Sequence, residues 1–525
     1  MLALGGCGKS DKPDDDARAG TSGSSGGGAG GTAAGHGGSA GKLSSELGGD
    51  AGAVNGGRGG AGVAGTAGSG LMTGGAGGRA GSASGGHAGA RAGAGGRPSG
   101  GSAGEGEGGE APAGAVDPVP APGASWTLPT VDPLNSTPPV LAPLGDAVVI
   151  AGGTSDPKLA GVDAFDAGID SEAFVAALDR KGKPIWSTPL PGAGLPQAIA
   201  VAPSGDIVVV AAYLPDATFV STGFYGPETL IAKLSPTGTL KYAKHVEFES
   251  GDLSLAIDAD GSIYLGGAEI VPDGADTANV TVARFDADAQ PTWLKRFAHT
   301  GSTAYADAIA LAKNGDVVIT GQFNGSVSFG GDTLTTQAKF DASLMQNGFI
   351  ARFTKDGDHV RSERFGGKIF DEGAVLTALS GGELLLAGML SGTATLGGKS
   401  VEASEQGSAF LARIGDDDQA SWVALAGEGY VWTVAVDPDE SMFHVAGDLG
   451  ADRWLTEFRA DGSQVLAAGR PANDLFFTTS MAVDSGLGLW LSGGFMGTAD
   501  FGGGTVLSST DAGVFLVRLE RSGAP

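Results

Sequence analysis

Residues 307–321 read DAIALAKNGDVVITG: an apolar segment, a turn built on Asn, Gly and Asp, and a second apolar segment. Residues 198–212 (AIAVAPSGDIVVVAA) and 254–267 (SLAIDADGSIYLGG) repeat the pattern. Two apolar runs joined by such a turn are typical of a β-hairpin. Because a hairpin cannot bury its own apolar face, we expect the repeated copies to stack on one another.

The repeat returns throughout residues 123–525, and each of the first six units contains four predicted strands. The second strands are expected to begin near Ala147, Asp206, Ser262, Asp316, Glu383, Ser441 and Gly488. Three units also carry a related insert between the second and third strands, at residues 325–331, 392–398 and 497–503. Each insert ends in Gly-Gly after Phe or Leu and predicts a short additional hairpin.

The seventh unit has no fourth strand of its own, but residues 124–130 match the fourth-strand pattern. Trp126 occupies the place that Trp186, Trp293 and Trp422 hold in other units. The sequence therefore predicts an all-β fold: a seven-bladed β-propeller of four-stranded blades, with residues 124–130 closing the last blade. The equivalent places of these four tryptophans indicate packing between blades rather than a carbohydrate-stacking set.

With these units the chain resembles bacterial seven-bladed β-propeller repeat proteins, whose repeats read Asp-x-x-Gly-x-hydrophobic-Tyr/Val-hydrophobic-x-Gly-x-Phe and carry Phe-Gly-Gly inserts. The resemblance covers roughly residues 124–525. It implies a scaffold found in secreted proteins or surface lipoproteins, with no shared catalytic residues.

The chain before the repeats has a different composition. Residues 8–122 are rich in Gly, Ala and Ser, and the first aromatic residue is Trp126. Such a segment cannot bury enough apolar surface to offset its conformational entropy, so we predict a disordered linker. A chain of this length and flexibility spans about 60 Å.

Cys7 is the only cysteine and stands in the sequence Leu4-Gly-Gly-Cys7, which resembles a bacterial lipobox. The resemblance implies acylation of Cys7, so residues 1–7 are interpreted as the remnant of a lipoprotein signal. Only Met1-Leu-Ala precede the box, without a charged or an apolar region, and we expect the true start to lie upstream. A chance match is the alternative. Residues 3–10 also fit a loose phosphate-loop pattern, but Pro13 and the acidic run 14–16 cannot form the helix that such a loop needs.

The formal net charge is −27, and nearly all of it belongs to the repeats. This acidity disfavours nucleic acid and anionic membrane surfaces as direct partners. No segment reaches the roughly 18 apolar residues of a membrane-spanning helix. We therefore expect a monomer whose contact with the membrane is the lipid anchor alone.

Two residue types in the repeats are candidate site residues. Asp-rich turns, at Asp258, Asp286, Asp356, Asp416 and Asp437, suit calcium, but Asp also belongs in turns for backbone reasons, which is the preferred interpretation. Four histidines fall in the repeats without metal-ligand spacing: His245, His299, His359 and His444. They are interpreted as solvated residues on strand faces, three of them on fourth strands or their ends.

The sequence thus predicts a cell-envelope lipoprotein whose propeller is a non-enzymatic binding or structural module for an unknown envelope or extracellular protein or polysaccharide. No catalytic residue, cofactor or metal ligand is assigned, although calcium stays open. An envelope polysaccharide lyase or glycoside hydrolase is one alternative, and a calcium-stabilised adhesin is another.

Overall fold

The computed structural model describes residues 124–127, 138–154, 172–190, 194–213, 228–248, 250, 253–270, 278–301, 303–336, 346–367, 370–450, 453–469, 476–501 and 506–520. Every helix or strand assigned in these ranges is a β-strand, so the prediction of an all-β fold is confirmed there. Accordingly, no helix in the described ranges is long and apolar enough to cross a membrane. The linker of residues 8–122 and Cys7 lie outside the described residues.

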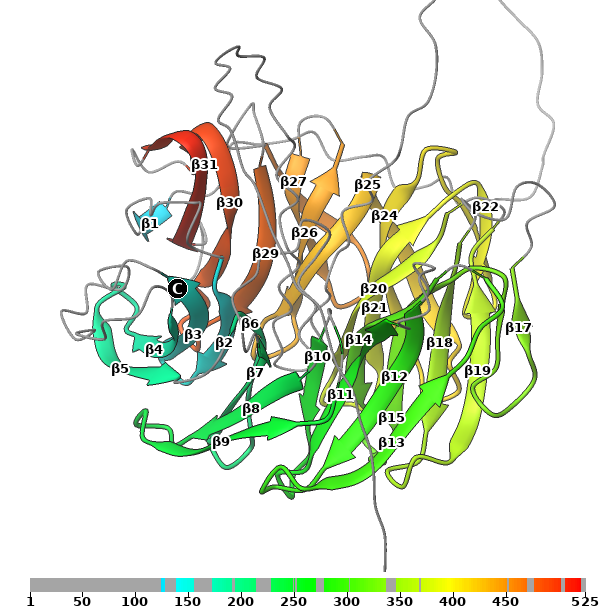
Figure 1. Ribbon diagram of the computed structural model, residues 1–525. Helices are drawn as coiled ribbons and strands as arrows, with labels where there is room; N and C mark the ends of the chain where they lie inside the picture. The colour runs from blue at the N-terminus through cyan, green and yellow to red at the C-terminus, as the bar shows by residue number, and fades with distance from the viewer. Residues whose placement is uncertain are drawn as a thin grey trace, which may run out of the picture. The chain divides into compact units, whose positions relative to one another are not determined.

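The strands form antiparallel four-stranded sheets in chain order (Figure 1), which we name by their first, innermost strand. The β2 sheet contains β2 (Val140–Leu144), β3 (Ala147–Thr154), β4 (Glu172–Leu178) and β5 (Pro184–Leu190). The β6 sheet contains β6 (Pro196–Val201), β7 (Ile207–Tyr213), β8 (Glu228–Leu234) and β9 (Leu240–Val246). The β10 sheet contains β10 (Leu253–Ile257), β11 (Ile263–Ile270), β12 (Ala278–Phe285) and β13 (Pro291–Phe297).

The β14 sheet contains β14 (Ala304–Leu311), β15 (Val317–Phe323), β18 (Asn347–Phe353) and β19 (His359–Phe365). The β20 sheet contains β20 (Glu372–Ala378), β21 (Leu384–Leu390), β24 (Ser408–Ile414) and the first half of β25 (Ala420–Val436). The second half of β25, with β26 (Met442–Leu449), β27 (Arg453–Arg459) and β28 (Gln464–Gly469), forms the β25 sheet. Sharing β25 joins the last two into one seven-stranded sheet.

The β29 sheet draws on both ends of the described chain. It contains β29 (Phe476–Val483), β30 (Leu489–Asp500), β31 (Val506–Leu519) and β1 (Ala124–Thr127). β1 pairs antiparallel with β31, with Trp126 opposite Arg518 (Figure 1). Trp293 lies opposite Arg284 and Trp422 opposite Arg413 in the same register. The domain boundaries themselves stay a prediction.

The innermost strands contact one another in succession. β2 contacts β6, β6 contacts β10, and so on through β14, β20, β25 and β29, which contacts β2 again. Four-stranded antiparallel sheets joined through their first strands in a closed cycle are the arrangement of a β-propeller. The second strands begin at, or one residue after, the positions that the repeats predicted.

All three inserts form hairpins, as predicted. β16 (Ser326–Val327) pairs with β17 (Leu334–Thr335), and β22 (Thr393–Leu396) pairs with β23 (Lys399–Glu402). The third insert adds no separate strands, because β30 and β31 simply continue, from the pair Gly497–Ser509 to the pair Asp500–Val506.

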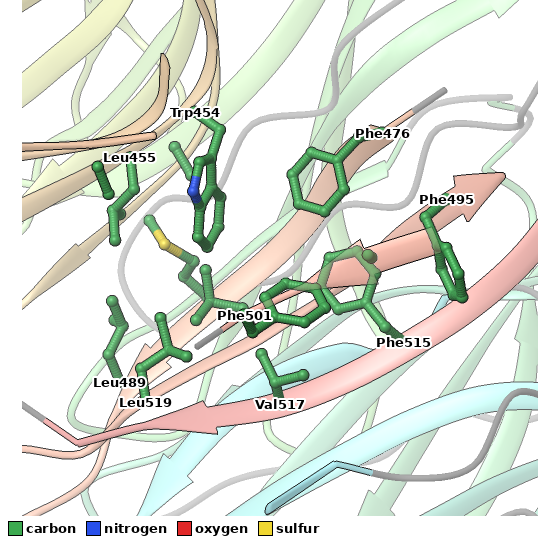
Figure 2. Packing of buried hydrophobic residues seen from close by; sticks show 14 of the residues in the cluster. Trp454, Leu455, Phe476, Leu489, Phe495, Phe501, Phe515, Val517 and Leu519 are labelled. Carbon is green, nitrogen blue, oxygen red and sulfur yellow. The ribbon is translucent and has the colours of Figure 1, made fainter. Parts of the chain in front are cut away.

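The core consists of apolar layers between neighbouring sheets. Figure 2 shows the layer between the β25 and β29 sheets, where Trp454, Phe476 and Phe515 pack together. The rings of Phe476 and Phe515 are stacked with centroids 5.3 Å apart. Full burial of a side chain of this kind contributes about 1.5–3 kcal/mol, so the layers supply most of the favourable energy that holds sheet to sheet.

In three sheets a fourth-strand tryptophan packs against the next sheet. Trp293 donates its indole N–H to Lys355 O (3.0 Å) in the turn between β18 and β19, and Trp422 donates to Ala460 O (3.2 Å) between β27 and β28. A Cβ on Gly462 would lie 2.7 Å from Trp422 Cδ2, so this turn needs glycine both for ring contact and for its φ of +84°. Trp186 packs in the same way on the turn at Gly238. The interpretation of these tryptophans as packing residues is confirmed.

Candidate functional site

Each sheet has two ends, which differ in the connections between strands that lie there. At one, the entry end, the innermost strand begins and the second strand finishes. At the other, the turn end, tight turns join the first strand to the second and the third to the fourth. Contacts between sheets join turn end to turn end, as when Arg180 of the β2 sheet donates to Ser485 Oγ of the β29 sheet (2.9 Å). Propellers bind ligands where loops gather at one end of the ring, so the entry end is the first place to look.

Three aromatic rings form a row at the entry end. Tyr430 and Trp432 lie on β25 with ring centroids 5.4 Å apart and planes inclined by 13°. Trp432 also stacks on Phe477 of β29, at 5.5 Å and 20°. Tyr430 and Phe477 are half-buried, whereas Trp432 is only 8% exposed. The row therefore crosses from one sheet to the next and keeps part of its apolar surface accessible.

Local backbone structure makes the row possible. The pairing of β25 with β26 shifts between Val431 and Thr433, so Trp432 occupies a β-bulge. Bulges re-aim a side chain out of the regular alternation. A Cβ on Gly494 would overlap the ring of Phe477, so the missing side chain at this position of β30 leaves room for that ring to lie on the sheet.

The indole N–H of Trp432 is buried and has no hydrogen-bond partner among the described residues. A buried donor that lacks an acceptor costs about 1–3 kcal/mol. An acceptor oxygen brought by a ligand, or by water, would remove this cost. The row therefore offers a flat apolar surface and one hydrogen-bond donor.

Equivalent bulges occur on other innermost strands. The bulged residues are Gln197, Asp307, Ala374, Trp432 and Thr479, and all are buried. The same register position thus carries an amide, a carboxylate, an indole and a hydroxyl in different sheets. After the aromatic row, these side chains of the innermost strands are the second set that could orient a ligand.

A buried carboxylate lies between the β14 and β20 sheets at the entry end. Asp371 accepts N–H bonds from Gly367 (2.8 Å), from Ser391 (2.9 Å) and from the Asn347 side chain (3.0 Å). Burial raises the pKa of Asp371 to about 6, although these three donors oppose the shift. With no exposed surface, Asp371 cannot touch a ligand, so it acts by positioning the loops that carry its donors.

The turn end is held by ion pairs. A cation on the third strand pairs with a carboxylate of a turn: Arg352 with Asp418 at 2.7 Å, and Arg518 with Asp484 at 2.7 Å. Arg352, Asp418, Arg518 and Asp484 are all nearly fully buried. Such pairs are costly to break from one side, because the remaining charge stays buried.

His444 corrects one sequence interpretation. It lies on β26, is fully buried, and contacts two carboxylates, Asp437 Oδ1 from Nε2 (2.9 Å) and Glu457 Oε1 from Nδ1 (3.1 Å). The prediction that the histidines are solvated strand-face residues is therefore wrong for His444. The prediction that His245, His299 and His359 lie on fourth strands or their ends is confirmed by β9, β13 and β19.

The Asp-rich turns use their carboxylates on their own backbone. Asp258 Oδ1 accepts N–H bonds from Asp260 (2.9 Å) and Ser262 (2.8 Å), and Asp286 Oδ1 accepts the equivalent pair from Asp288 and Gln290. Such bonds are the backbone role expected of Asp in turns. Within the described ranges, no group of three or more His, Cys, Asp or Glu side chains could hold a metal ion.

The aromatic row and Asp371 were missed by sequence reasoning. The signal for the row was present, because Trp432 is an aromatic residue at a first-strand position where other sheets carry Gln197, Asp307, Ala374 or Thr479. Nothing near Asp371 distinguishes it from the other Asp residues of the loops. Its burial arises only when two sheets pack together.

No family model matches the sequence, and no curated protein matches it. Among solved structures, the chain is similar to virginiamycin B lyase from Staphylococcus aureus (10% identity, 75% of this chain and 99% of that chain, TM-score 0.42). It is similar to the β-propeller domain of the trilobed protease from Pyrococcus furiosus (12% identity, 74% and 97%, TM-score 0.40). A third is the Pan2 WD40 domain of Neurospora crassa (9% identity, 74% and 94%, TM-score 0.40). TM-scores below 0.5 carry no argument about the function of this chain.

Proposed function

We propose that this protein is a tethered binding module: a seven-bladed β-propeller that holds a ligand at its entry end and is anchored to the cell envelope through Cys7. The cycle of contacts among the innermost strands supports the ring, and the split of β25 between two sheets supports the blade count. The pairing of β1 with β31 supports closure by the N-terminal strand.

The row of Tyr430, Trp432 and Phe477 carries the proposal of binding. Half-exposed stacked rings and a buried indole N–H without a partner together suit a ligand with a flat apolar face and an adjacent hydrogen-bond acceptor. Sugar rings of an envelope polysaccharide and aromatic side chains of a protein both have this chemistry. No arrangement among the described residues favours a polysaccharide-cleaving enzyme over a binding module, and a non-enzymatic role is part of the proposal.

Arrays of defined glycans and of defined peptides test this function. Tyr430→Ala removes the first ring of the row, and Trp432→Phe keeps an apolar ring but removes the donor. We expect Tyr430→Ala to weaken binding about tenfold and Trp432→Phe to weaken it less, since one aromatic pair contributes about 0.5–1.5 kcal/mol. Leu425→Ala is the matched control, because Leu425 is an exposed apolar residue on the same strand, outside the row. Equal binding by all variants would contradict a site at the row.

Anchoring is tested separately by metabolic labelling with a fatty-acid analogue. The gene is extended upstream of the codon for Met1, so that a complete signal can be read, and Cys7→Ala serves as the control. Label on the wild-type protein and none on Cys7→Ala is the expected result. An unlabelled wild-type protein would rule out the anchor and leave the binding proposal standing.

A further inference from the structure

Three sheets carry a related cluster at their turn end. An Asp follows the first strand, a ring side chain stands on the second strand, and a charged residue stands opposite the ring on the third. In the β10 sheet these are Asp258, Tyr264 and Arg284; in the β29 sheet they are Asp484, Trp490 and Arg518; in the β25 sheet they are Asp437, His444 and Glu457. The ring contacts the Asp in all three, at 3.2, 2.9 and 2.9 Å.

The third-strand charge is reversed in the β25 sheet. Arg284 and Arg518 each bring a positive charge near their Asp, so those clusters are held by permanent cations. Glu457 instead brings a second negative charge. Within the described residues, the ionisable groups that act on His444 are Asp437 and Glu457; Glu440, in the same turn, accepts the N–H of Ser380 from the neighbouring sheet.

Hydrogen-bond geometry requires a proton in this cluster. A neutral imidazole has one N–H and can donate to only one of two carboxylates, whereas an imidazolium donates to both. Both ring nitrogens of His444 lie within 3.1 Å of a carboxylate oxygen, and all three residues are buried. Without the proton, the imidazole could donate to only one of the two buried carboxylates, and the other would face a ring nitrogen that carries a lone pair, which is destabilising.

We propose that Asp437, His444 and Glu457 form a proton-dependent latch, which holds the β25 sheet closed while the cluster is protonated and loosens that sheet when the proton leaves. The other sheets with this cluster have no such dependence, because arginine keeps its charge at every relevant pH. The inference does not rest on the proposed binding function.

The direction of the pH effect follows from the surroundings of His444. Burial alone would lower the pKa of His444, but hydrogen bonds and charges from Asp437 and Glu457 outweigh burial and raise the pKa above its ordinary value. The latch is therefore fully formed below the unfolded value of about 6.5 and is lost as the pH rises through the folded pKa. Alkaline conditions should loosen the β25 sheet first.

Hydrogen–deuterium exchange of the full chain, read by mass spectrometry between pH 6 and 10 and corrected for intrinsic exchange, tests the latch. We expect protection of β26 and β27 to fall by about tenfold per pH unit between the unfolded value of about 6.5 and the folded pKa, where the closed sheet holds one proton more than the open one. β30 and β31 in the same sample are the reference and should keep their protection. Constant protection of β26 across this range would overturn the proposal.

A double variant, His444→Tyr with Glu457→Arg, gives the β25 sheet the residues of the β10 sheet and should abolish the pH dependence while keeping the sheet closed. A pH slope equal to that of the wild type would also overturn the proposal. If the double variant fails to fold, His444→Gln decides the question, because an amide that cannot be protonated should lower protection at pH 6 and remove the slope. A retained slope in His444→Gln would place the titrating group elsewhere.

Discussion

The β25 and β29 sheets each bury an aspartate, but the third strand brings a negative charge near it in the β25 sheet and a positive charge in the β29 sheet. Each has a buried Asp after its first strand, Asp437 or Asp484, and a ring that bonds to it. In the β29 sheet the compensating cation is Arg518 on the third strand, and in the β25 sheet it is the imidazolium of His444 on the second. The position of the cation thus changes while the need for one does not, since a buried carboxylate must be paired.

The next sheet explains why Glu457 is tolerated. Elsewhere the third-strand cation also donates to a carbonyl in the neighbouring sheet, as Arg413 does to Ala460 O (3.2 Å) between β27 and β28. The sheet after the β25 sheet lacks such a turn, because the outer neighbour of β31 is β1, which precedes it in sequence. An arginine in place of Glu457 would have no equivalent carbonyl to reach, so this position is free to carry another charge.

The largest effect is expected from removing the permanent cation. Arg518→Met keeps the aliphatic part of the side chain but removes the guanidinium that pairs with the buried Asp484 at 2.7 Å, so the nearer of its two cations is lost and Arg180 stays at 3.9 Å. We expect the free energy of unfolding to fall by about 3–5 kcal/mol, as for other buried pairs broken from one side. Urea unfolding of the full chain at pH 7 measures the loss. A loss below about 1 kcal/mol would mean that Arg518 is not what compensates Asp484.

The outer strands give the second contrast. Leu466 of β28 lies opposite Glu457, at the position where other sheets have an aromatic ring or Arg361. In the next sheet β31 and β1 are not consecutive in the chain, so no turn joins its third and fourth strands and Leu466 has no such turn to contact. Trp126 holds the tryptophan register on β1, opposite Arg518 as Trp293 is opposite Arg284. Trp126→Ala should therefore cost about 3 kcal/mol or more and Leu466→Ala about 1–2 kcal/mol. Equal losses in thermal unfolding would refute the closing role of Trp126.

The two sheets should respond to pH with opposite sign. Burial alone would raise the pKa of Asp484, but bonds from Arg518, Trp490 and Gly488 outweigh it and hold the pKa below its ordinary value. Its contribution is therefore present above the unfolded value of about 3.9 and lost as the pH falls through the folded pKa. We expect exchange protection of β30 to fall in acid, whereas loss of the His444 proton lowers the protection of β26 in alkali. Acid loss in β26 before β30 would contradict this assignment of charges.

The sequence predicted the positions of the strands but not the buried charged clusters. The turn residues and apolar runs that set the first two strands are local, so β7 and β15 begin one residue from the predicted positions. The role of Trp422 was also predictable, since its equivalent place in other units is visible in the sequence. In the sequence His444 could not be distinguished from the other histidines, because its partner Glu457 lies thirteen residues away on another strand. Stacking of Trp432 on Phe477 likewise requires two sheets to meet.

The smallest loss of stability is expected from an exposed ion pair at the contact between the β2 and β29 sheets. Arg180 pairs with Asp146 at 2.7 Å and lies 3.9 Å from Asp484, but its side chain is 43% exposed and that of Asp146 is 81% exposed. Arg180→Ala should lower the free energy of unfolding by less than about 1 kcal/mol, because water screens an exposed pair. Added salt should shrink this small loss further and leave the larger loss of Arg518→Met nearly unchanged. A salt-sensitive Arg518→Met variant would show that the cation of the β29 sheet is not shielded from water, and the contrast with His444 would then rest on geometry alone.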